Sequence, residues 1–206
     1  MCETNWNGCD RSLQKCKKQG EFKLGLMDIF NGKPEDDDFD PLNDLELAKM
    51  KVGFYVDYDM KTWQVTAYNR YDFGEGLWSN EWELTSGREK VYLERREDDE
   101  AEWTLSKKLP IGAITEDVRS HIREFDDPPG QIEVKGKTYY LDESGPVYFY
   151  PGGKGPKQGL IAWEYVSEDL EELVTIEQWG EDEFEATEGF YVEEFQFTNI
   201  LPGEIS

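Results

Sequence analysis

Side chains that could serve as a catalytic nucleophile or base are scarce in this chain. A serine or cysteine nucleophile usually needs a histidine beside it, and His121 is the one histidine of the sequence. It stands among apolar residues on an expected helix, where a histidine is more often a residue at the core boundary than a catalyst. We therefore expect a protein that is not an enzyme, and we assign no catalytic residue.

Carboxylates are abundant, with 46 Asp and Glu residues, so their number alone indicates nothing about catalysis. A catalytic acid needs a pKa that burial or a neighbouring charge has shifted. Glu83 and Glu164 come closest to this, because each follows a tryptophan. On an alternating strand each would point away from that tryptophan. If the tryptophans belong to the core, both glutamates are therefore expected at the outer surface.

The acidic run EDDDFDPLND is the best candidate for a metal site. Asp36, Asp38 and Asp40 have the alternate spacing with which an EF-hand loop begins. However, Pro41 replaces the turn glycine, and Leu47 stands where the loop needs its glutamate. We interpret the run as a solvated linker and assign neither a metal nor any other cofactor, with a metal-ion buffer left as a third hypothesis.

The three cysteines favour a reducing compartment. Cys2, Cys9 and Cys16 form an odd, clustered set without a CxxC pair, which argues against a disulfide framework. Free thiols are typical of the cytosol. The N-terminus lacks the apolar core of a signal peptide, and no stretch approaches the roughly 20 apolar residues of a membrane span. We expect a cytoplasmic protein.

The charge of the chain restricts its partners. The formal net charge is −24, which repels nucleic acids and anionic membrane surfaces. No Lys or Arg follows Lys157, whereas the last 49 residues contain 14 acids. The natural partner of this acidic half is a basic protein or a cationic ligand. Solubility alone is the simpler interpretation of the same charge.

The elements that would position these residues are mostly strands. From Lys51 onward, short runs rich in Val, Thr, Tyr and Trp alternate with turn residues. One helix is expected at 115–125, with Thr115 as its N-cap. Such spacing is typical of an all-β, mainly antiparallel fold, either a sandwich or a barrel. The expected strands are 52–58, 62–71, 77–86, 89–97, 101–107, 132–136, 137–143, 146–151, 159–167, 173–180, 183–190 and 192–200.

The strands repeat a pattern. WEL at residues 82–84 corresponds to WEY at 163–165, and both are followed by a V-x-[LI]-E strand and an acidic turn. We infer two related β-meanders, at about 48–110 and 130–200, within a body that spans residues 46–206. Coincidence among glutamate-rich strands is the alternative.

Residues 1–45 differ from the body and are expected to form a flexible N-terminal arm. The arm contains a short apolar group that either docks on the body or contacts a membrane or a partner. We expect membrane contact through this arm only. Because LGLMDIFNGK has the character of a protein start, we hypothesise that residues 1–23 precede the natural one. The apolar group consists of Leu24, Leu26, Met27, Ile29 and Phe30.

Four stretches resemble a bacterial family, domain of unknown function 4178: KVGFYVDYDMKTWQV, WSNEWEL, VYLERREDDEAEWTLSK and IEQWGEDEFEATEGFYVEEFQF. The likeness covers roughly residues 48–200. The family has no established activity, so the resemblance implies no catalytic residue. It implies only an association with proteins encoded beside membrane-stress and polyamine-related genes.

Together these observations predict a non-catalytic interaction protein. Its acidic, aromatic-rich β body would bind a basic partner or a cation, with a link to membrane stress. The alternative is a small-ligand binder, for example of a polyamine, or an enzyme with an aromatic pocket. The residues expected to line that pocket are Tyr139, Tyr148, Trp163 and Trp179.

Overall fold

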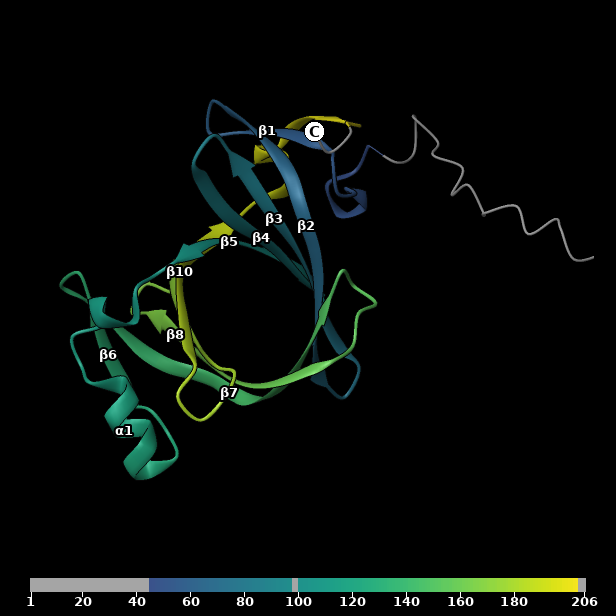
Figure 1. Cartoon of the computed structure of the whole chain (residues 1–206). Helices are drawn as coiled ribbons and strands as arrows, with labels where there is room; N and C mark the ends of the chain where they lie inside the picture. Colours follow the sequence, from purple (N-terminus) through teal and green to yellow (C-terminus); the bar gives the residue numbers. More distant parts are fainter. Residues whose placement is uncertain (1–44, 98–99, 204–206) are drawn as a thin grey trace, which may run out of the picture. The chain divides into compact units, whose positions relative to one another are not determined.

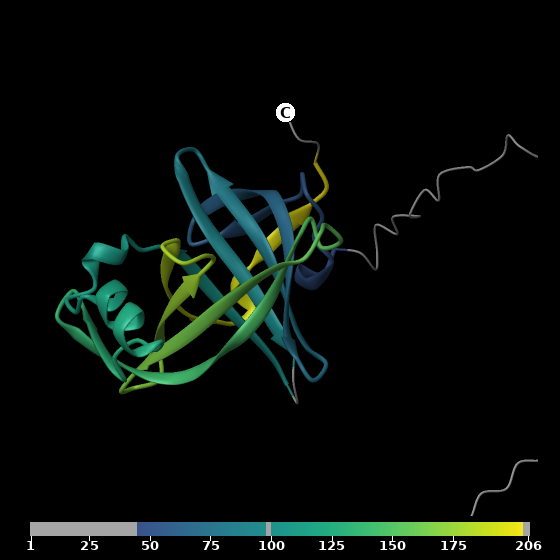
Figure 2. The same ribbon diagram turned by 60° about the horizontal axis from the view of Figure 1, so that its bottom comes forward.

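A computed structural model of the chain describes residues 45–97 and 100–203. Its strands belong to one antiparallel sheet that closes on itself (Figures 1 and 2). The all-β prediction is confirmed, and of the two architectures left open the structure has the barrel. The strands are β1 (Tyr55–Tyr58), β2 (Lys61–Gly74), β3 (Leu77–Ser86), β4 (Glu89–Glu97), β5 (Ala101–Lys108), β6 (Gln131–Val134), β7 (Lys137–Pro151), β8 (Gln158–Ser167), β9 (Glu172–Gln178), β10 (Phe184–Val192) and β11 (Thr198–Leu201).

Eight strands form the closed barrel, in the order β2-β3-β4-β5-β10-β9-β8-β7. Closure depends on the two longest strands. The first residues of β2 pair with β1, and its later residues 69–72 pair with residues 148–151 of β7. The first residues of β7 likewise pair with β6. Thus β1, β11 and β6 extend the sheet beyond the barrel wall.

Two long strands differ from the prediction. Residues 137–151 form one strand, although two strands were expected, because Ser144 and Gly145 of the supposed turn pair regularly with β8. The irregularity of this strand lies earlier, as a β-bulge between Leu141 and Glu143. The expected strand 192–200 is interrupted by the 3-10 helix η3 (Glu194–Gln196). A capping box fixes η3 locally, because the Glu193 amide donates to the Gln196 side chain at 2.7 Å.

The helix α1 (Val118–Phe125) begins three residues later than predicted. Its N-cap is Asp117, whose carboxylate accepts a hydrogen bond from the Ser120 amide at 3.2 Å. The predicted cap, Thr115, is instead bonded through its amide to the Glu133 carbonyl. Among the described residues no helix is long and apolar enough to cross a membrane.

The largest apolar cores lie on the outer faces of the barrel wall. Trp163 and Ile176 are buried in a cluster with Val118 and Ile122 of α1, and α1 lies outside the ring of strands (Figure 1). On the other flank Trp82 is buried against Trp103, and its indole donates to the Met50 carbonyl at 2.9 Å, just after η1 (Leu47–Lys49). Because strand side chains alternate, the residues beside these face the barrel interior.

Residues 1–44 of the expected N-terminal arm lie outside the described residues. So do the five apolar residues proposed for docking within it, and Asp36, Asp38 and Asp40 of the acidic run.

Candidate functional site

The interior of the barrel contains a cavity of about 1060 Å³, lined by inward side chains of its eight strands. The lining is strongly acidic. Among the described residues it includes two cations, Arg96 and Lys108, against nine carboxylates. The carboxylates are Glu81, Glu94, Glu102, Asp142, Glu143, Glu164, Glu177, Glu183 and Glu185.

Both cations of the cavity are already paired. The Arg96 guanidinium contacts Glu143 at 3.1 Å and Glu164 at 3.3 Å, and it lies 4.5 Å from the centre of the Phe73 ring. The Lys108 ammonium is paired with Glu185. The remaining negative charge in the cavity is therefore not balanced by the described side chains.

Six of the nine lining carboxylates have no ion pair within residues 45–97 and 100–203. Three of these six are exposed, whereas Glu81, Glu94 and Glu177 are half-buried, and we call these last three the carboxyl triad. Glu81 and Glu94 occupy opposed positions on β3 and β4, and Glu177 belongs to β9. One oxygen of Glu94, Oε1, is buried without a hydrogen-bond partner. Leaving a buried carboxylate oxygen without a hydrogen-bond donor costs free energy. A ligand that donates a hydrogen bond to Glu94 Oε1 would remove this cost.

Glu81 is held by β2. The Asn69 amide donates to its Oε1 at 2.9 Å, and the Tyr71 hydroxyl lies 3.5 Å from its Oε2. Burial raises the pKa of Glu81, the charges of Glu94 and Glu177 add to the shift and the Asn69 bond opposes it, so that the pKa is about 8. Glu81 thus carries a proton for much of the time at neutral pH.

Glu177 is positioned by Trp179, the residue directly after β9, whose indole donates to Glu177 Oε2 at 3.2 Å. Burial raises the pKa of Glu177 to about 7, with Lys108 opposing the shift and Glu185 and Glu94 adding to it. The triad members therefore influence one another across the cavity, as carboxylates that share a site do.

An apolar surface adjoins the triad within the same cavity; we call it the aromatic cluster. Its rings are in contact: the centroids of Tyr71 and Phe149 are 5.0 Å apart, and Trp179 meets Phe149 edge-on at 5.2 Å. The cluster consists of Tyr71, Phe73, Val147, Phe149, Leu160, Ala162 and Trp179.

The four residues expected to line one pocket are not brought together. Trp179 lines the cavity. Trp163 is buried in the outer core, where its indole donates to Asp127 at 3.0 Å. Tyr148 is exposed, with the Lys157 ammonium 3.9 Å from its ring centre.

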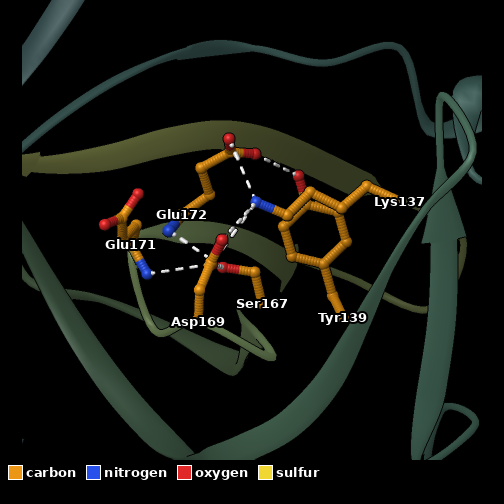
Figure 3. Close-up of polar contacts among 6 residues, drawn as sticks. All are labelled: Lys137, Tyr139, Ser167, Asp169, Glu171 and Glu172. Carbon is orange, nitrogen blue, oxygen red and sulfur yellow. Dashed lines mark hydrogen bonds and ion pairs between the residues drawn. The ribbon is translucent and has the colours of Figure 1, made fainter.

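The fourth of them, Tyr139, belongs to a polar network at the β8–β9 turn (Figure 3). Its hydroxyl donates to Glu172 at 2.8 Å, and the Lys137 ammonium contacts Glu172 at 3.1 Å. Ser167 donates to Asp169 at 2.5 Å, and this bond is the main reason that the pKa of Asp169 is lowered. Because these polar groups satisfy one another, the network fixes the turn and offers little to a ligand.

A second cavity, of about 1070 Å³, lies beside this network. Its central carboxylate, Glu188, contacts Lys135 at 2.6 Å and Lys107 at 3.4 Å. Among the described residues its lining has five carboxylates against three lysines, a smaller excess of negative charge than in the barrel interior. The barrel interior is therefore the stronger candidate for binding a cation.

The prediction that Glu164 lies at the outer surface was wrong. It does point away from Trp163, but the tryptophan packs on the outer face of the wall, so the glutamate faces the cavity. Glu83 is paired with Lys90 at 2.8 Å and is not part of the cavity lining. A signal for the triad exists in the sequence, since Glu94 and Glu177 each follow a strand residue that proves fully buried.

The described residues do not suggest a metal centre. No group of three or more His, Cys, Asp or Glu side chains in residues 45–97 and 100–203 is arranged to hold a metal ion. His121 lies on α1, where its Nδ1 is 2.7 Å from the Asp127 carbonyl oxygen.

The fold and cavity define an antiparallel β-barrel protein with a polar, acidic interior. Residues 51–194 match the family model described as domain of unknown function (DUF4178), and the chain belongs to this family, as the resemblance predicted. It is also 29% identical, over 156 residues, to an uncharacterized protein of Aquifex aeolicus (strain VF5). That alignment covers 76% of this chain and 85% of the relative. No solved structure matches the chain.

Proposed function

We propose that this protein binds a small organic cation, such as a polyamine, inside its barrel. The observation that carries the proposal is the carboxyl triad, which lines a cavity whose two described cations are already paired. An ammonium group offers three hydrogen-bond donors and a positive charge. It would donate the hydrogen bond that Glu94 Oε1 lacks, and its positive charge would favour the ionised forms of Glu81 and Glu177.

A small ligand suits the position of the acids better than a basic protein does. Two acids of the C-terminal half, Glu164 and Glu177, are half-buried and line the cavity. A protein surface would not reach them. Binding through the interior therefore replaces binding through an acidic face as our leading hypothesis.

We also propose that the two halves of the barrel arose by duplication of one β-meander. Each half begins with a two-residue hairpin loop of positive φ, at Asp59-Met60 and at Lys135-Gly136. The pairs Val65–Leu84 and Leu141–Tyr165 then occupy matching positions, each directly before a bulge. A duplicated barrel would place Glu94 and Glu177 at equivalent sites on β4 and β9.

Calorimetric titration of the full chain with spermidine and putrescine tests the cation proposal. We expect saturable binding that weakens as salt rises from about 0.05 M to about 0.5 M, because screening shortens the reach of the charges. Magnesium chloride alone should give no comparable heat. The triple substitution Glu81→Gln, Glu94→Gln, Glu177→Gln should abolish binding.

The matched control is Glu124→Gln, which removes an exposed carboxylate from α1, outside the barrel. It should bind as the unmodified protein does. Equal loss in both variants, or equal binding by both, would contradict the proposal. The cytoplasmic location and the link to membrane stress stay proposals from the sequence, and fractionation of host cells under membrane stress tests them.

A further inference from the structure

We propose that the ligand of the barrel is an amine with an apolar body, with the ammonium group at the carboxyl triad and the hydrocarbon against the aromatic cluster. This inference rests on the cation-binding function proposed above and names the class of ligand. It distinguishes a primary alkylamine from a polyamine, whose charges are spread along the whole molecule.

The triad and the aromatic cluster are physically continuous. Trp179 connects them, because its indole N–H donates to Glu177 of the triad while its ring packs edge-on against Phe149 of the cluster. Tyr71 joins them a second time: its hydroxyl lies 3.5 Å from Glu81, and its ring is 5.0 Å from that of Phe149. A molecule bound at the carboxylates therefore extends directly onto apolar side chains.

The apolar part of the cavity is formed by strands at the closing seam. Val147 and Phe149 of β7 face the interior beside Leu160 of β8, and Tyr71 and Phe73 come from β2. Such side chains form a buried core in most small proteins, yet here they line a cavity of about 1060 Å³. Tyr71, Val147 and Leu160 are already buried, whereas Phe73, Phe149, Ala162 and Trp179 are only partly buried. Covering the exposed apolar surface of these four with hydrocarbon removes it from water, which favours binding.

The polar part independently indicates where the charge of the ligand lies. Glu94 Oε1 is buried without a partner, and Glu81 and Glu177 flank it with carboxyls whose only described donors are neutral side chains. Arg96 and Lys108 are occupied by Glu143, Glu164 and Glu185. A cationic head group thus has one favoured place, next to the aromatic cluster.

A homologous series of linear alkylamines, from propylamine to heptylamine, tests this by calorimetric titration of the full chain. Each added methylene buried against the cluster should tighten binding by about fourfold, in line with the transfer free energy of a CH₂ group. The heat capacity change of binding should become more negative along the series.

Two substitutions on β7 provide a matched pair. Phe149→Ala removes a ring of the cluster and should flatten the dependence on chain length. Tyr148→Ala removes the neighbouring ring, which is exposed on the other face of the strand, and should leave that dependence unchanged. The series on the unmodified protein remains decisive even if Phe149→Ala fails to fold.

The outcomes separate this inference from the function on which it rests. Binding of spermidine and of all the alkylamines with no gain along the series would overturn the apolar-body inference and leave cation binding intact. Failure of every amine to bind would overturn both. Tightening along the series that Phe149→Ala abolishes would support both.

Discussion

At the scale of single residues, Glu81 shows how a carboxyl group can be kept protonated near neutral pH. Burial and the charges of Glu94 and Glu177 raise its pKa to about 8, although the Asn69 hydrogen bond and the charge of Lys108 oppose the shift. Sequence alternation could predict that Glu81 and Glu94 share one face of the sheet. It could not predict that this face is enclosed, because enclosure depends on the pairing of β2 with β7.

The raised pKa values predict that the ligand-free protein loses stability as pH rises. The folded-state pKa is about 8 for Glu81 and about 7 for Glu177, above the ordinary 4.5. The native state therefore holds protons that the unfolded chain has released, and this stabilisation is complete below about pH 4.5 and lost by about pH 8. The free energy of unfolding should fall by about 5 kcal/mol between pH 5.5 and 8.5.

Urea denaturation across that pH range measures this loss. Glu81→Gln should remove much of it and be relatively more stable at pH 8.5, whereas the control Glu124→Gln should follow the unmodified protein. A stability that rises over this range, or a Glu81→Gln variant with the same pH dependence as the parent, would show that Glu81 is ionised in the folded state.

At the scale of elements, the hairpin loops show a local mismatch between sequence and conformation. Asp59-Met60 joins β1 to β2 with φ of 47° and 59°, and Lys135-Gly136 joins β6 to β7 with φ of 54° and 82°. Positive φ at both positions suits a two-residue hairpin, and glycine adopts it without strain. The second loop contains this glycine and the first does not. The residue types predicted where the turns lie. They did not predict the strain in the first loop, because it arises only when the loop has two residues and both take positive φ.

Met60→Gly should therefore stabilise the protein by about 0.5–1 kcal/mol, because it relieves the left-handed conformation at a fully exposed side chain. The reverse change, Gly136→Met, should destabilise it by a similar amount. Thermal and urea unfolding of the two variants provide the measurement. A destabilising Met60→Gly would mean that unfolded-chain entropy outweighs the strain at this loop.

At the scale of the whole molecule, the barrel has its main apolar cores outside and a polar cavity inside. The strand positions and their period of two were predictable, as was the helix, because each is a local pattern. The sequence did not predict which face of the strands turns inward. It indicates that Trp82 and Trp163 are buried but not which segments cover them. The covering comes from the segments before each half, around η1 and α1.

This arrangement predicts unequal effects on stability for substitutions at two neighbouring residues of β9. Ile176 is fully buried in the outer core, whereas Thr175 lines the cavity. Ile176→Ala should lower the free energy of unfolding by about 2–5 kcal/mol, because it leaves a void in a packed core. Thr175→Ala should change it by less than about 1 kcal/mol. Equal losses in urea unfolding would show that the barrel interior is packed as tightly as its flanks.

The most direct test of cation binding inside the barrel is a nitrogen–proton correlation spectrum of the tryptophan indoles, recorded during separate titrations with hexylamine and spermidine. The Trp179 indole is bonded to Glu177 in the cavity, whereas the Trp163 indole is bonded to Asp127 in the outer core. A ligand at the carboxyl triad should shift the Trp179 signal and leave that of Trp163 in place. If neither amine moves the Trp179 signal while exposed backbone amides shift, the cations bind at the surface and the account is contradicted.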